Sequence, residues 1–70
     1  MKSITKGKIG EKYTIRKISG AEKVRQHLAE LGFVVDEDIT IVSGTDGDLI
    51  LQVKEARIAW GKEIAQHILI

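Results

Sequence analysis

The sequence contains no cysteine and no proline, and its 70 residues include one phenylalanine, one tryptophan and one tyrosine. Without cysteine, the chain forms no disulfide and offers no thiolate to a metal ion. A domain of this size therefore depends on an efficient apolar core for its stability. Apolar residues, mainly Ile, Val, Leu and Ala, make up 43% of the sequence, which is enough to form such a core.

The charge and the apolar runs narrow the function classes further. The formal net charge is +1, whereas a dedicated nucleic-acid-binding domain carries a strong basic excess. No stretch approaches the ~20 apolar residues of a membrane-spanning helix, and Met1 to Thr5 has no run typical of a signal peptide. We therefore expect a single domain over residues 1–70 that is cytoplasmic, does not span the membrane and has no nucleic-acid partner.

Glycines divide the chain into short segments that mostly favour strands. In the opening loop we expect Ile4 and Ile9 to be buried anchors. Five strands follow from the alternation and the turn signals, at residues 11–18, 39–43, 49–54, 57–60 and 68–70. Ile18 breaks the alternation of the first strand, which indicates a bulge or an inward turn there. Asp46-Gly47 predicts a hairpin turn, and residues 62–67 predict a short second helix.

One helix is marked at both ends. Ser19 and Glu22 have the spacing of a capping box, in which each side chain bonds the other's backbone amide. Ala21, Val24, Leu28 and Leu31 form an apolar stripe that we expect to pack on the sheet. Gly32 fits the position after the helix, where positive φ is needed, and this places Leu28 and Phe33 at the contacting positions of a Schellman motif.

The predicted fold is mostly β, with one well-defined helix and a short C-terminal helix. Five short strands with tight connections favour a small, partly open, five-stranded β-barrel, because closure hides strand edges that a chain this small tolerates poorly. The expected structural residues are Ser19, Glu22, Leu28, Leu31 and Gly32.

Four features of the chain occur in a characteristic order. They are Gly10 followed by a strand and Ile18-Ser19-Gly20, the helix end Leu28-x-x-Leu31-Gly32-Phe33, the hairpin Gly47-Asp48, and Arg57-Ile58-Ala59-Trp60 before a short helix and Ile68-Leu69-Ile70. Together they resemble the FeoA family, the small cytoplasmic component of bacterial ferrous iron uptake, over essentially the whole chain.

The resemblance implies an SH3-like barrel with a helix inserted after the first strand. It also implies a non-enzymatic role beside FeoB, the GTP-binding membrane permease for Fe(II), with the chain possessing no cofactor and lying in the cytoplasm, at the inner face of the membrane when its partner holds it there. A similar domain stands at the C-terminus of iron-dependent repressors, so a metal-responsive regulatory module is the alternative function.

The chain departs from the family's usual sequence at three places. Val34-Val35-Asp36-Glu37 stands where a Pro-Gly turn usually follows the helix, Leu49 replaces a common proline, and Trp60 replaces a common leucine. These differences leave the expected fold unchanged. The first of them leaves apolar groups, Val34 and Val35, just beyond the helix.

An iron-linked role directs attention to possible metal ligands. His27 and Glu30 are three residues apart on the first helix, and Glu63 and His67 are four apart on the second. Imidazole with carboxylate suits Fe(II), but a site needs three or more ligands, and these pairs lie on different elements. We therefore expect solvated helix residues and assign no metal site.

The acidic runs and the serines have simpler explanations than a catalytic or calcium site. Asp36-Glu37-Asp38 and Asp46-Gly47-Asp48 lack the full calcium-loop pattern, and Asp favours turns because it tolerates positive φ. The three serines, Ser3, Ser19 and Ser43, lack the context of a nucleophile elbow. No glycine-rich phosphate loop is present, so we expect no enzyme.

Protein binding remains as the function that the residues favour. Leu28, Leu31, Phe33, Val34 and Val35 concentrate apolar groups at the helix end. We expect Leu28 and Leu31 to be buried, and we predict that apolar groups left uncovered there form a surface for a partner. Trp is common at interface hot spots, which adds Trp60. The predicted partner-binding residues are Phe33, Val34, Val35 and Trp60.

Overall fold

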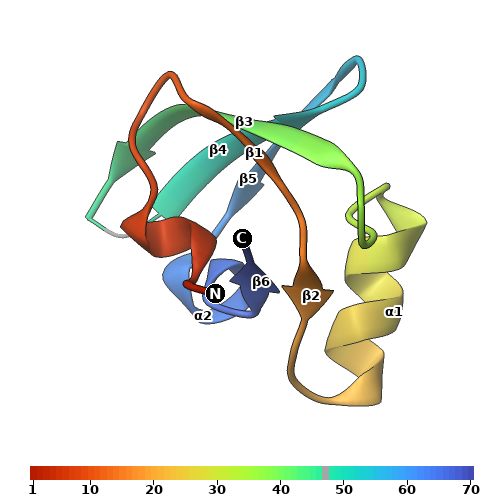
Figure 1. Ribbon diagram of the computed structural model, residues 1–70. Coiled ribbons are helices and arrows are strands. Elements are labelled where there is room, and N and C mark those ends of the chain that lie inside the picture. Colours follow the sequence, from red (N-terminus) through yellow and green to blue (C-terminus); the bar gives the residue numbers. More distant parts are fainter. Residues whose placement is uncertain (47) are drawn as a thin grey trace.

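The computed structural model describes residues 1–46 and 48–70. Figure 1 shows a curved antiparallel sheet above two helices, with α1 at one end of the molecule and α2 below the sheet. The elements in chain order are the 3₁₀ helix η1 (Ile4–Lys6), β1 (Lys12–Thr14), β2 (Lys17–Ile18), α1 (Glu22–Glu30), β3 (Asp38–Thr45), β4 (Asp48–Val53), β5 (Ala56–Trp60), α2 (Lys62–Ala65) and β6 (Ile68–Leu69).

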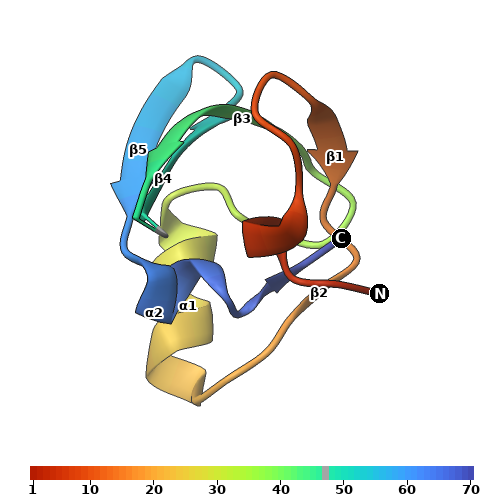
Figure 2. The same ribbon diagram turned by 90° about the vertical axis from the view of Figure 1, so that its left-hand side faces the viewer.

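The main sheet has the strand order β1-β3-β4-β5 and is antiparallel throughout. Alternation along β4 buries Leu49, Leu51 and Val53 on one face, as the sequence predicts. Figure 2 shows β1 and β5 at the two opposite edges of the sheet, where they do not pair with each other, so the sheet does not close. The turn predicted at Asp46-Gly47 includes Gly47, which lies outside the described residues.

The first predicted strand is divided in two. Residues 11–18 form β1, which pairs with β3, and β2, which pairs with β6 in a separate two-stranded sheet. Between them Ile15 is fully buried, and its backbone bonds Glu37 (N···O 2.9 Å) and Asp36 (N···O 2.8 Å). The chain therefore changes sheets at Ile15, so the described residues form six strands rather than the five predicted.

The end of α1 has the predicted Schellman motif. The Phe33 amide donates to the Leu28 carbonyl at 2.9 Å, and the Gly32 amide donates to the Ala29 carbonyl at 3.0 Å. Gly32 has a φ of 96°, a conformation that costs glycine least. The helix end is therefore determined by residues close together in the sequence, and it could be predicted from them.

The start of α1 differs from the prediction. Ala21 is the N-cap residue and makes no side-chain cap bond, while the Glu22 carboxylate accepts from Gln26 at 3.3 Å. The Ser19 hydroxyl instead lies 3.1 Å from Nδ1 of His67, and the Ser19 amide donates to the His67 carbonyl at 2.9 Å. The predicted capping box is wrong because Ser19 directly follows β2 and bonds a distant turn rather than the helix.

The core corrects two predictions of burial. Ile4 and Leu28 are fully buried as expected, but Ile9 is 63% exposed and Leu31 is 39% exposed. Ile9 lies at the tip of a turn, and Leu31 is the C-cap residue beyond the packed part of α1. The buried cluster comprises Ile4, Ile15, Leu28, Phe33, Ile39, Ile41, Leu49, Leu51, Val53, Trp60, Ala65 and Ile68.

Candidate partner-binding surface

Phe33 and Trp60 lie in the core rather than on the surface. Phe33 is 0% exposed and Trp60 is 7% exposed, and their rings pack edge to face with centroids 5.6 Å apart. A partner cannot contact side chains that the protein itself covers. The expectation that these two residues bind a partner directly is therefore corrected: they pack on each other within the core.

Trp60 also brings a polar atom, its indole Nε1, into the core. Its Nε1 has no hydrogen-bond partner among the described residues, and its ring packs edge to face on His27 with centroids 5.5 Å apart. His27 is otherwise an exposed residue of α1. Its ring thus forms part of the cover over Trp60, a role that its position in the sequence does not reveal.

Three exposed apolar side chains remain together at the end of α1. Leu31, Val34 and Val35 are 39%, 41% and 51% exposed; Leu31 lies within the Schellman motif, and Val34 and Val35 follow it. We call these three residues the helix-end surface. Of the residues predicted to bind a partner, Val34 and Val35 are the two that the structure leaves accessible.

The helix-end surface is held by a defined turn. The Glu37 amide donates to the Val34 carbonyl at 3.1 Å, and Asp36, the third residue of this turn, has a φ of 74°. The Asp36 amide also donates to the carbonyl of the buried Ile15 at 2.8 Å. Positive φ at the third residue is typical of a type II turn, so Val35 occupies its outward second position.

Acidic residues precede and follow the apolar centre along the chain. Glu30 precedes it on α1, and Asp36, Glu37 and Asp38 follow it, with Glu37 half-buried and the other three exposed. The Asp38 carboxylate accepts from the Thr14 hydroxyl at 2.8 Å, which joins β3 to β1. An apolar centre with an acidic rim is suited to a protein surface that is apolar with basic residues around it.

Among the described residues, neither predicted pair, His27–Glu30 or Glu63–His67, belongs to a group of side chains that could hold a metal ion. His67 is half-buried and bonds Ser19, while His27 and Glu30 are exposed on α1. Within residues 1–46 and 48–70, no group of three or more His, Cys, Asp or Glu side chains is arranged to hold a metal ion.

The Ser19–His67 pair has the atoms of a nucleophile and a base, but its surroundings indicate a structural role. The Ser19 hydroxyl also lies 3.4 Å from the His67 carbonyl, and a Cβ added at the adjacent Gly20 would lie only 3.0 Å from Nδ1 of His67. The pair therefore fastens β2 to the turn before β6. Sequence reasoning missed it because the partners are 48 residues apart.

Open hollows lie on the sheet, and two of them are formed by described residues in and beside its strands. One, of about 280 Å³, is lined by charged and polar side chains, and the other, of about 220 Å³, lies at the far end of β4. The lining residues are Lys12, Glu37, Asp38, Thr40, Gln52 and Lys54 in the first, and Ser43, Gly44, Thr45, Asp48, Leu49, Ile50 and Ala59 in the second. Neither includes a histidine or the Ser19–His67 pair.

Comparison with known proteins identifies relatives of the whole chain. The FeoA domain family model matches residues 2–70. The crystal structure of an iron uptake regulatory protein (FeoA) has a TM-score of 0.84 at 26% identity, covering 94% of this chain and 88% of that one. No curated protein sequence matches.

Two further structures share the fold. FeoA of Stenotrophomonas maltophilia complexed with zinc, described as an SH3 domain protein, has a TM-score of 0.85 at 19% identity, covering 99% of this chain and 88% of that one. A manganese-dependent transcriptional repressor has a TM-score of 0.86 at 19% identity, covering 94% of this chain but only 38% of the repressor. The predicted SH3-like fold is confirmed.

Proposed function

Because the chain belongs to the FeoA family, we propose that it is a non-enzymatic accessory protein of bacterial ferrous iron uptake, acting by contact with the cytoplasmic part of a FeoB-type GTP-binding permease. The observation that carries the proposal is the helix-end surface, an exposed apolar cluster on a rigid turn in a chain whose family is linked to iron transport. Among the described residues, no helix is both long and apolar enough to cross a membrane.

The helix-end surface is suited to docking for two physical reasons. Leu31, Val34 and Val35 remain partly exposed, so contact with a partner removes apolar area from water. The turn at Val34–Glu37 and the Schellman motif hold them in place before binding, which reduces the ordering cost of association. The acidic rim selects a partner with basic residues around its apolar patch.

Capture of the permease's soluble cytoplasmic domain on the immobilised chain tests the proposal. We expect wild-type protein to retain the domain, and Val34→Asp/Val35→Asp to weaken capture by at least roughly tenfold, since carboxylates then enter the apolar centre. Ile50→Asp is the matched control, because Ile50 is a 38% exposed apolar residue on β4 and its change adds the same kind of charge elsewhere.

The possible outcomes distinguish an error in the proposed docking site from an error in the proposed function. If the double variant keeps its fold by circular dichroism and still captures the domain, the helix-end surface is not the docking site. If the wild-type chain captures neither the soluble domain nor the whole permease in detergent, the proposed function is wrong. Measuring GTP hydrolysis with and without the chain then distinguishes a role in assembly from a role in the GTP cycle.

A further inference from the structure

Charge is distributed unevenly along the chain. Residues 1–17 hold six of the 11 basic residues and one of the ten acidic residues, whereas residues 18–70 hold five basic and nine acidic residues. The six basic residues are Lys2, Lys6, Lys8, Lys12, Arg16 and Lys17. The near-zero net charge of the protein therefore conceals a strongly basic segment.

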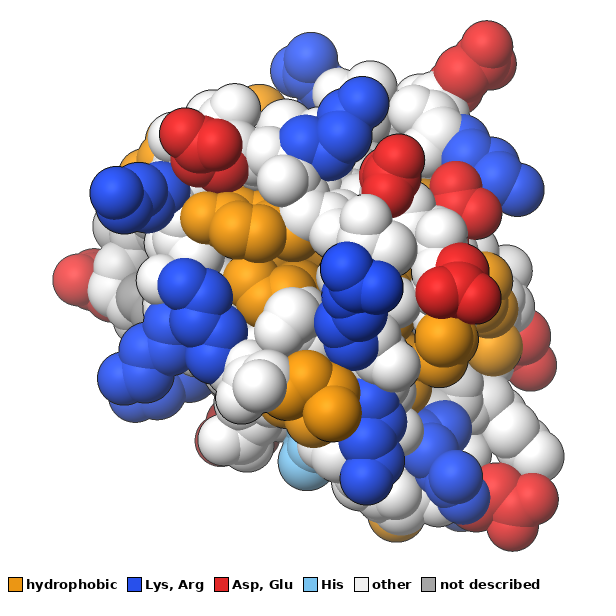
Figure 3. Space-filling view, in the orientation of Figure 1, with side chains coloured by type: hydrophobic (Ala, Val, Ile, Leu, Met, Phe, Trp, Pro, Cys, Tyr) orange, Lys and Arg blue, Asp and Glu red, His pale blue; other side chains and the backbone are white. Residues whose placement is uncertain are grey.

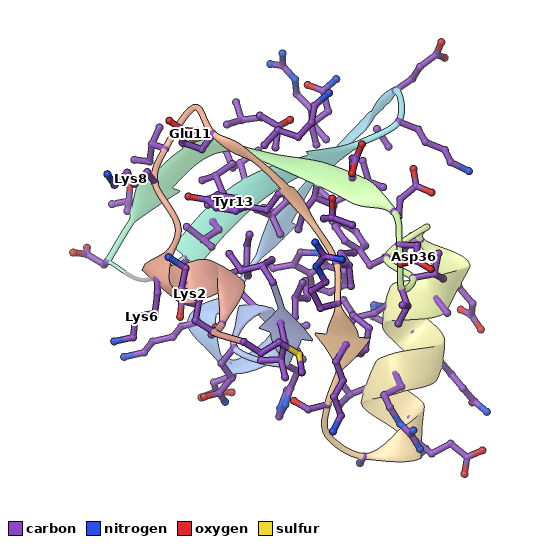
Figure 4. All side chains as sticks on the ribbon, in the orientation of Figure 1. Lys2, Lys6, Lys8, Glu11, Tyr13 and Asp36 are labelled. Carbon is purple, nitrogen blue, oxygen red and sulfur yellow. The ribbon has the colours of Figure 1, made fainter. Side chains whose placement is uncertain are left out.

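Three of these lysines gather on one side of the molecule. Figure 4 shows Lys2, Lys6 and Lys8 along η1 and its flanks, on the side opposite to Asp36. Figure 3 shows several basic side chains on the same side, with apolar groups between them and fewer acidic side chains. All three lysines are exposed. This part of the surface is thus positive, while the rim of the helix-end surface is negative.

An exposed isoleucine stands at the edge of this positive region. The Glu11 amide donates to the Lys8 carbonyl at 3.1 Å, which closes a turn over Lys8–Glu11, and Gly10 at its third position has a φ of 88°. Ile9 occupies the outward second position and is 63% exposed. The turn therefore presents an apolar tip directly beside Lys8.

The turn is held firmly on the sheet. The Gly10 amide donates to the Ile41 carbonyl at 2.7 Å, and the Lys8 amide donates to the Tyr13 hydroxyl at 2.8 Å. Gly7 allows the approach, because a Cβ there would lie 2.7 Å from Cδ1 of Ile41. Ile9 is thus kept exposed by specific contacts around it.

We propose that Lys2, Lys6, Lys8 and Ile9, the basic face, bind the surface of an anionic lipid bilayer. The ammonium groups reach the lipid phosphates while Ile9 enters the boundary between headgroups and acyl chains. This surface is distinct from the helix-end surface, so the chain contacts membrane and protein partner through different residues.

The composition of the basic face favours lipid over nucleic acid or an acidic protein. Single-stranded nucleic acid is bound on exposed aromatic platforms, and the nearby Tyr13 is half-buried with its hydroxyl bonded to Lys8. A single apolar tip among flexible lysines suits a fluid surface, because an acidic protein patch offers no apolar layer beneath its charges. Glu11, the one acidic residue in the turn, lowers the local charge without cancelling it.

Vesicle flotation of the full chain, without any permease, tests the proposal. We expect binding to vesicles of phosphatidylcholine mixed with phosphatidylglycerol and none to phosphatidylcholine alone. Lys2→Gln/Lys6→Gln/Lys8→Gln should weaken binding by roughly a hundredfold, since each lysine near an anionic surface contributes about fivefold. Lys23→Gln/Arg25→Gln/Lys54→Gln removes the same charge from α1 and the turn between β4 and β5, and should leave most binding intact.

A second pair of variants tests the apolar tip. Ile9→Ser should weaken vesicle binding by roughly tenfold, because it removes the group that enters the bilayer. Ile50→Ser changes an exposed apolar residue on β4 and should bind as the wild type does. Circular dichroism and thermal unfolding confirm that each variant is folded, and Ile9→Thr replaces Ile9→Ser if the serine variant is not.

Four outcomes would overturn the proposal. Equal loss of vesicle binding in both charge variants would mean that net charge alone attracts the chain to vesicles. Unchanged binding of Ile9→Ser would mean that Ile9 does not enter the bilayer. Displacement by inorganic phosphate would indicate a phosphate site rather than a membrane surface. Tighter binding to single-stranded RNA or to an acidic peptide than to the vesicles would assign the basic face to that partner. None of these results depends on the permease, so the proposed function is tested separately.

Discussion

Two turns of the same geometry present apolar tips on different parts of the surface. In each, the amide of the fourth residue donates to the carbonyl of the first at 3.1 Å, and the third residue has a positive φ, 88° at Gly10 and 74° at Asp36. The second residues, Ile9 and Val35, are 63% and 51% exposed. The backbone is therefore used twice to keep an apolar side chain out of the core.

The two turns differ in the charge around them. Lys6 and Lys8 accompany Ile9, whereas Asp36, Glu37 and Asp38 accompany Val35. Apolar contact alone discriminates poorly between partners, and charge supplies the selection. The comparison shows that one small domain can present apolar tips in surroundings of opposite charge without changing its backbone design.

The largest predicted effect concerns the buried residue that anchors the Val34–Glu37 turn. Phe33 leads into the Val34 turn and is fully buried against Trp60, so Phe33→Ala should lower the free energy of unfolding by about 3–5 kcal/mol. Urea unfolding followed by circular dichroism measures this. Val34→Ala, at a 41% exposed neighbour, should cost less than about 0.5 kcal/mol. Similar losses in the two variants would show that Phe33 is not the anchor.

The second prediction concerns ionic strength. Raising the salt concentration screens exposed charges, so vesicle binding by the basic face should weaken by roughly tenfold or more between low and high salt. Capture of the permease domain through the apolar helix-end surface should weaken much less, because its centre is uncharged. Flotation and capture assays in the same buffers measure both. Parallel loss in the two assays would remove the proposed distinction between the surfaces.

Features specified by neighbouring residues could be predicted from the sequence. The Schellman end of α1 depends on Leu28, Gly32 and Phe33 alone, and the buried face of β4 follows from simple alternation. Asp36 has a φ of 74°, in keeping with the turn predicted for the acidic run at residues 36–38. In each case the chemistry and its partner lie within a few residues.

Features set by distant residues could not be predicted. Ser19 has good capping spacing, but His67 takes its hydroxyl. Ile9 has the character of a core residue, yet Tyr13 and Ile41 hold its turn at the surface. Trp60 and Phe33 cover each other, so the apolar count near the helix end overstated the accessible surface. Two of the four residues predicted to bind a partner are therefore buried, and partner binding through Val34 and Val35 stays a prediction.

The third prediction tests the turn that carries Ile9. At Gly10 a new Cβ meets no atom within 4 Å, so Gly10→Ala introduces backbone strain at positive φ and no steric clash. We expect a loss of about 1 kcal/mol in the free energy of unfolding and weaker vesicle binding. Gly61→Ala is the control, because Gly61 has a φ of −66° and a Cβ there would meet only Oδ1 of Asp48, at 3.7 Å. An equal loss at Gly61 would show that the effect is not due to positive φ.

The smallest predicted effect lies at the matching position of the other turn. Asp36 already has a positive φ, which aspartate tolerates at some cost, so glycine relieves strain there while adding freedom to the unfolded chain. Because these terms oppose each other, Asp36→Gly should raise the free energy of unfolding by only about 0.3 kcal/mol. Asp36→Ala should lower it by about 0.5 kcal/mol, since alanine lacks the local hydrogen bonding of aspartate. Thermal unfolding of the three proteins measures the order, and an alanine variant as stable as the glycine variant would mean that φ at this position is not fixed by the turn.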